Sequence, residues 1–112
     1  MEVSFAAKVF GEDRSIKVEN DPSWGKMKIL FNSAITKNGK GDERIDINQF
    51  FDKLLELVVI DGFPEVKIKD KLLQVPTSEM TYILGEILKV IPLQQYMNNL
   101  GIMENGNLAN LI

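Results

Sequence analysis

Four carboxylates lie close together in the sequence and could carry out acid–base chemistry. They are Asp42, Glu43, Asp46 and Asp52. Catalysis by paired carboxylates requires two groups in different environments that face one cleft. These four fall on a polar loop and on the solvated face of an expected helix, where a charge cluster serves solubility. We therefore expect no carboxylate active site in this region.

The same region, residues 38–50, has the outline of a calcium-binding loop between two helices. Such a loop needs oxygen ligands at its third and twelfth positions and a glycine at its sixth. Here those positions hold Lys40, Gln49 and Glu43. Three essential features fail, and Asp46 is better explained as a helix cap. We expect no metal site.

Other kinds of chemistry are excluded by composition. The chain contains no cysteine and no histidine, so it lacks thiolates and the commonest general base and metal ligand. It has no serine nucleophile elbow, phosphate-binding glycine loop or zinc signature. Thirteen basic and sixteen acidic residues give a net charge of −3, which argues against nucleic-acid binding. The sequence therefore predicts a protein that is not an enzyme and has no cofactor.

Length and composition predict one globular domain over residues 1–112, with 45% hydrophobic and 26% charged residues. The longest apolar run, Leu57 to Ile60, is far too short to span a membrane. Glu2 follows the first methionine, where a signal peptide would carry basic residues and myristoylation would require glycine. We expect a cytoplasmic protein with no membrane partner.

Three segments have the apolar spacing of amphipathic helices. The first begins at Asp21-Pro22 and fades at Thr36, and the second begins at a cap formed by Asp46 and ends at Asp61-Gly62. The third follows Pro76, with Thr77 or Ser78 as its cap, and is broken by Pro92. The side chains expected in the core of these helices are Trp24, Phe31, Phe50, Leu54, Ile83, Leu84 and Ile87.

Two segments leave alternatives open. Residues 1–20 alternate apolar and other side chains around a turn at Gly11-Glu12-Asp13, which fits a short β-hairpin, a short helix or a mobile arm. Residues 63–75 fit either a helix or a strand, with helix favoured. The expected fold is mainly α, a small bundle of three to five helices. It consists of an N-terminal arm (1–20), a helical core (21–100) and a tail (101–112).

The end of the chain is apolar and almost without charge. From Pro92 to Ile112 the only charged side chain is Glu104, so this stretch is either a frayed terminus or a segment that orders against a partner. Flexible apolar side chains such as methionine suit adaptable helix-in-groove binding. We expect partner binding here, in a groove between residues 50–59 and 80–91 and through the side chains Leu93, Tyr96, Met97, Leu100 and Ile102.

A family resemblance rests on residues 45–100. The run Leu72-Leu73-Gln74-Val75-Pro76-Thr77-Ser78-Glu79-Met80, leading into a helix that ends at Val90, follows a helix at Phe50–Val59 and a short linker. This arrangement resembles the small tail assembly chaperones, or tape measure chaperones, of long-tailed phages that infect Gram-positive bacteria. Overall length, acidic balance and lack of cysteine are also similar.

The resemblance implies a chaperone that coats the tape measure protein, or another long helical polypeptide, before the tail tube polymerises in the host cytoplasm. Many copies would act together, as a homo-oligomer or a head-to-tail spiral. The alternative is a small regulatory binding protein, an inhibitor or antitoxin-like partner of a single host protein.

Overall fold

The computed structural model describes residues 1–37 and 43–93. An antiparallel sheet with the strand order β1-β2-β5 consists of Glu2–Val9, Glu12–Glu19 and Val59–Asp61. A two-stranded ribbon is formed by β3 (Ile35–Lys37) and β4 (Glu43–Ile45). The helices are α1 (Trp24–Ala34), α2 (Ile47–Val58), the 3-10 helix η1 (Pro64–Lys67), α3 (Lys69–Leu72) and α4 (Thr77–Val90).

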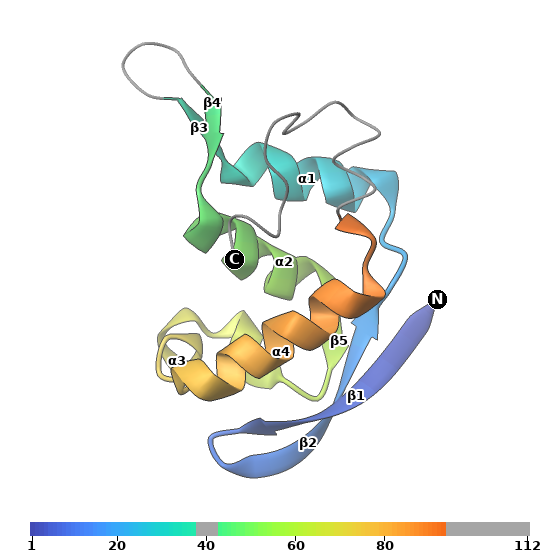
Figure 1. The fold of residues 1–112 in the computed structure, drawn as a ribbon, viewed down its shortest axis with the longest axis vertical. Helices are drawn as coiled ribbons and strands as arrows, with labels where there is room; N and C mark the ends of the chain where they lie inside the picture. Colours follow the sequence, from blue (N-terminus) through green and yellow to red (C-terminus); the bar gives the residue numbers. More distant parts are fainter. Residues whose placement is uncertain (38–42, 94–112) are drawn as a thin grey trace.

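The prediction of a mainly helical bundle is wrong. The fold is a small α/β fold in which the antiparallel sheet supplies part of the core. In Figure 1, α4 lies beside the β1–β2 hairpin, α1 lies towards the opposite end of the molecule, and α2 lies between α1 and α4 in this view. The helix-based prediction failed because residues 1–20 form a hairpin and because residues 59–61, predicted to belong to a helix, pair with that hairpin as a third strand.

Of the three alternatives for residues 1–20, the structure has the hairpin. Strands β1 and β2 pair from Glu2 opposite Glu19 to Val9 opposite Glu12. One face of the hairpin is buried and the other is exposed, as the period-two pattern requires, and the buried side chains are Ala7, Val9, Ile16 and Val18. An isolated hairpin is marginally stable, and β5 and α4 provide the partner surface that it needs.

Helix α1 begins two residues later than predicted, at Trp24 and not at Pro22. Its cap is Ser23, whose Oγ accepts a hydrogen bond from the amide of Lys26 at 3.2 Å. Met27, Leu30, Phe31 and Ala34 form the buried stripe. The prediction that Trp24 lies in the core is wrong, because its side chain is 49% exposed. Helical spacing fixes the direction of Trp24 but not whether another element lies opposite it.

Helix α2 confirms the predicted cap and corrects the predicted end. The Asp46 Oδ1 atom accepts hydrogen bonds from the amides of Asn48 and Gln49 at 3.0 and 3.2 Å. The helix stops at Val58 because strand β5 follows directly, with Val59 opposite Val18 and Asp61 opposite Lys17 of β2. Gly62 therefore ends a strand and not a helix. Glycine is required here for two reasons. Its φ is +88°, and the backbone at Ser15 passes so close that a Cβ atom at position 62 would lie 2.0 Å from the Ser15 carbonyl oxygen.

The segment between α2 and α4 is helical, as favoured, but in two short pieces, η1 and α3. Helix α4 begins at Thr77 with Pro76 in the cap position, so neither predicted capping residue occupies that position. Its end at Val90, before Pro92, agrees with the prediction.

One core joins the sheet to the helices. Phe31 on α1 and Phe50 on α2 face each other with ring centroids 5.9 Å apart. Of the residues predicted for the core, Phe31, Phe50, Leu54, Ile83 and Ile87 are buried and Leu84 is partly buried. The 1–20 segment adds its four buried side chains to this core, so it is an integral part of the domain.

Candidate interaction surface

The tip of the β1–β2 hairpin has an unusual backbone. Phe10 and Gly11 connect the strands with φ values of +53° and +77°. Two residues with positive φ are characteristic of the tight hairpin turn that matches the twist of the strands. Glycine adopts this conformation easily, whereas a bulky aromatic residue rarely does. The turn therefore lies one residue earlier than the sequence suggested, and Phe10 occupies a strained position.

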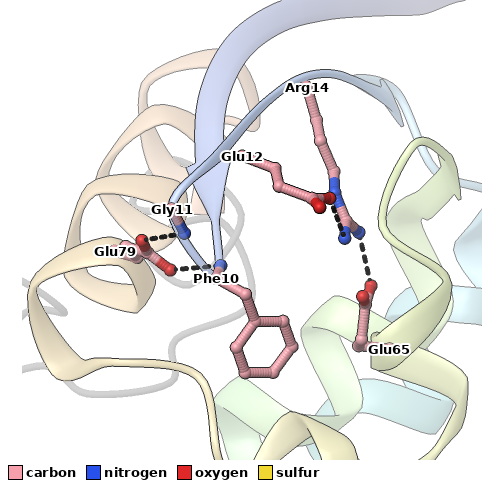
Figure 2. A network of polar contacts seen from close by, with 6 residues as sticks. All are labelled: Phe10, Gly11, Glu12, Arg14, Glu65 and Glu79. Atoms are coloured by element: carbon pink, nitrogen blue, oxygen red, sulfur yellow. Dashed lines mark hydrogen bonds and ion pairs between the residues drawn. The ribbon is translucent and has the colours of Figure 1, made fainter.

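A carboxylate from α4 holds this turn. Glu79 Oε1 accepts a hydrogen bond from the Phe10 amide at 2.7 Å, and Oε2 accepts one from the Gly11 amide at 2.8 Å. Figure 2 shows the two carboxylate oxygens aimed at the two neighbouring backbone nitrogens. Successive amides in a left-handed turn make a concave anion-binding site, and here the anion belongs to the same chain. The contact fixes the start of α4 against the hairpin.

A second polar link joins the hairpin to η1. Arg14 on β2 donates to Glu65 at 2.6 Å and to Glu12 at 3.3 Å, as Figure 2 also shows. The hydrogen bond from Arg14 lowers the pKa of Glu65 against the opposing effect of its partial burial. The hydrogen bond to Glu65 in turn raises the pKa of Arg14. These shifts describe a mutually stabilising ion pair and not a group prepared for acid–base catalysis.

A groove lies between β1 and the first turns of α4, and we call it the edge groove. Its volume is about 360 Å³, and it is lined by Ala6, Ala7, Lys8, Asp13, Ser78, Glu79 and Tyr82. Tyr82 is half exposed, and the small side chains of Ala6 and Ala7 leave the hollow open beside the strand. The groove thus combines an apolar floor with one cation and two carboxylates.

The edge groove follows a strand edge that no other described strand pairs with. In the sheet order β1-β2-β5, strand β1 is outermost over the described ranges 1–37 and 43–93. The Phe10 amide points away from β2 towards Glu79, while the carbonyl of Met1 accepts from Asn20 at the end of β2. Because backbone groups alternate along a strand, the even-numbered residues of β1 direct their amides and carbonyls to the open side.

Several large apolar side chains are exposed away from the groove. Leu73, directly after α3, is 79% exposed, and Ile68, before the same helix, is about half exposed. Trp24 and Ile29 are exposed on α1, with the Lys28 Nζ 5.7 Å from the centre of the Trp24 ring. Single exposed apolar residues are common on protein surfaces, so these alone indicate no site.

The described part of the chain offers no arrangement for metal chemistry. Within residues 1–37 and 43–93, no three acidic side chains come together as a metal site would require. In the same ranges no polar or charged residue is fully buried. Nor does any helix there have the length and apolar character needed to cross a bilayer.

The predicted partner-binding residues are only partly covered by the structure. Leu93 is 2% exposed and packs in the core. Tyr96, Met97, Leu100 and Ile102 lie outside the described residues. In the two segments between which a groove was predicted, Phe50, Leu54, Leu55, Val58, Ile83 and Ile87 are buried, whereas Met80, Leu84 and Leu88 are only partly buried.

The edge groove has almost no local signature in the sequence. In the sequence, Glu79 is only an acidic residue near the start of an expected helix, and its contact with a turn almost 70 residues away leaves no local signal. Phe10-Gly11 resembles the Asn-Gly type of hairpin turn only in its glycine. The alternation of residues 3–9 was the one available indication of a strand edge.

Comparison with known proteins gives no independent indication of function: no family model, curated protein or solved structure matches the chain.

Proposed function

We propose that the protein is a non-enzymatic tail assembly chaperone that acts in the host cytoplasm. It would bind the tape measure protein, a long helical polypeptide with apolar stripes, and keep it in solution until the tail tube forms. The observation that supports this proposal is the edge groove, where an open strand edge lies beside an apolar hollow.

The groove suits a polypeptide better than a small polar molecule. A helix keeps its own backbone hydrogen bonds, so a helical polypeptide would bind through the apolar side chains on one of its faces, which the hollow of the edge groove can take. Small-molecule sites instead rely on a few buried polar groups that fix the orientation of the ligand. Among the residues that the structure describes, none that is polar or charged is fully buried.

Coating a long chain requires many copies that bind weakly and leave easily. Exposed apolar stripes on an unassembled polypeptide promote aggregation. Modest affinity per copy, strengthened by multivalency and by contacts between copies, allows both protection and later displacement by tube subunits. The open edge of strand β1 is a surface through which copies of this protein could contact each other.

Co-expression with a tape measure protein tests the proposal. Wild type should keep the long polypeptide in the soluble fraction and co-purify with it. Tyr82→Asp should reduce this activity, because it places an unpaired charge beside the apolar floor of the edge groove. Thr81→Asp is the matched control, since Thr81 is exposed on the same helix and does not line the groove.

The segment nominated from the sequence is tested in the same assay. A variant with Tyr96, Met97 and Leu100 all replaced by aspartate should lose the partner if this segment binds it. Circular dichroism checks that each variant remains folded. If wild type never holds a tape measure protein in solution, the chaperone proposal is wrong and a regulatory role on a single host protein becomes the better hypothesis.

A further inference from the structure

We propose that the edge groove binds a second copy of this chain, by antiparallel pairing of one β1 strand with another across a two-fold axis. The pairing would join two three-stranded sheets into one six-stranded sheet. The inference goes beyond the proposed function and requires no tape measure protein. Because both proposals use the edge groove, a second copy and a tape measure polypeptide would compete for it.

The open side of β1 determines which residues can pair. Amides and carbonyls of Glu2, Ser4, Ala6 and Lys8 face away from β2, by the alternation that sends the Phe10 amide to Glu79. Antiparallel strands exchange hydrogen bonds between residues that both face the partner, so even-numbered residues must lie opposite even-numbered residues. Only registers that satisfy this condition are possible.

Glu79 limits the register further. The Phe10 amide already donates to the Glu79 carboxylate, so an added strand can pair only as far as Lys8 unless it displaces that carboxylate. The longest two-fold register that leaves this bond intact places Glu2 opposite Lys8 and Ser4 opposite Ala6, with Phe5 on the axis. If Glu2 lay opposite Ala6, fewer residues would pair. If Glu2 lay opposite Phe10, the pairing would need the Phe10 amide, which Glu79 already binds.

The charges favour the same register. Each Glu2 carboxylate would meet the Lys8 ammonium of the other copy, twice per dimer. Within one copy the Lys8 Nζ lies 3.8 Å from the Asp13 Oδ1, and the Lys17 Nζ lies 3.1 Å from the Glu2 Oε2. Pairing would therefore join these ion pairs into one row of alternating charge across the exposed face. Opposite charges directly across two strands stabilise their pairing, and like charges destabilise it.

Apolar surface on the other face is also left to be covered. Val3 and Phe5 are only partly buried, and Met1 is 86% exposed. In this register Val3 lies opposite Ala7 of the other copy and Met1 extends towards the hollow beside Ala7 and Tyr82. The groove of one copy therefore accommodates the first residues of the other.

Charge exchange tests the pairing in the absence of any client protein. Sedimentation should show a dimer for wild type, about tenfold weaker self-association for Glu2→Lys and for Lys8→Glu, and recovery when these two variants are mixed, because opposite charges then meet across the two copies. Lys69→Glu, an exposed charge reversal on α3, should leave the dimer unchanged. A wild type that stays monomeric at about 1 mM overturns the proposal, as does a mixture of the two variants that associates no better than either variant alone.

Introduced cysteines test the register, since the chain has none of its own. Ser4 and Ala6 are exposed, so cysteine at either position should not disturb folding. An oxidised mixture of Ser4→Cys and Ala6→Cys proteins should form a mixed covalent dimer, because directly opposed residues lie within disulfide range. Neither variant alone should form a covalent dimer, since two cysteines at the same position lie diagonally across the strands and not opposite each other. Crosslinking of either variant with itself, or none in the mixture, contradicts this register.

These experiments separate the two proposals. A dimer that does not hold a tape measure protein leaves the β1 pairing intact and removes the chaperone function. A protein that stays monomeric but keeps a tape measure protein in solution would support the chaperone function and contradict the β1 pairing.

Discussion

The Glu79 carboxylate accepts a hydrogen bond from the Phe10 amide at 2.7 Å, although 69 residues separate them in the sequence. The same carboxylate also holds the amide of Gly11, so one side chain on α4 fixes both residues of the hairpin turn. Through this contact the start of α4 and the tip of the hairpin keep a constant spacing, and the edge groove lies between them.

Removal of the Glu79 carboxylate should loosen the hairpin tip. We expect Glu79→Ala to lower the free energy of unfolding by roughly 1–2 kcal/mol, because two backbone amides lose a charged acceptor. Hydrogen exchange at Phe10 and Gly11 should accelerate. Glu86→Ala on the same helix is the control, since its pair with Lys89 spans one helical turn and should contribute less than about 0.5 kcal/mol. Equal losses for the two variants would contradict the role assigned to Glu79.

Replacement of the Asp46 cap should destabilise α2. Asp46→Ala removes the acceptor for two amides in the first turn, and we expect a loss of about 1 kcal/mol. Asp52→Ala, on the exposed face of the same helix, should change the stability little. Urea unfolding of both variants gives the comparison, and an unchanged midpoint for Asp46→Ala would show that the cap is not needed.

Three glycines should respond differently to alanine. Gly62→Ala should be the most damaging, because the added Cβ meets the Ser15 carbonyl and φ is positive. Gly11→Ala has open space around it and should cost about 1 kcal/mol for its backbone conformation alone. Gly85→Ala, inside α4 with no atom close to the new methyl group, should stabilise by roughly 0.5–1 kcal/mol. Thermal unfolding of the three variants should reproduce this order, and a tolerated Gly62→Ala would contradict the packing of β5 against β2.

The Arg14–Glu65 pair should make stability depend on acid pH. Because Arg14 lowers the pKa of Glu65 below its ordinary 4.5, the unfolded state binds the proton more readily. The stabilisation is complete above the ordinary pKa and is lost as the pH falls through the lower folded-state pKa. Glu65→Gln should therefore be less stable than wild type at neutral pH, with a difference that shrinks in acid. A difference independent of pH would mean that packing, and not charge, is what the substitution removes.

Calcium should have no effect on stability. The loop pattern at residues 38–50 lacks essential ligands, and the Asp46 carboxylate is used as a helix cap. A ligand that binds only the folded state raises the unfolding temperature. Melting curves with calcium and with EDTA should therefore coincide, and a clear rise with calcium would show that this region binds the ion.

The sequence by itself determined the features that depend on neighbouring residues. The Asp46 cap and the buried positions Phe50, Leu54, Ile83 and Ile87 agree with the structure because capping and helical periodicity act within a few residues. The end of α4 before Pro92 is equally local. The alternation of residues 3–9 allowed the hairpin but could not select it over a helix or an arm.

Only the tertiary structure decided the features that depend on distant contacts. Residues 59–61 leave the helical pattern because β2 offers backbone partners, and Gly62 is needed because that strand passes close to Ser15. Trp24 is about half exposed although it shares the helical spacing of the buried residues, because spacing alone does not determine burial. The edge groove exists because Glu79 meets a turn far away in the sequence. Such contacts gain their free energy only when the chain closes over long loops, so no short stretch of sequence carries their signal.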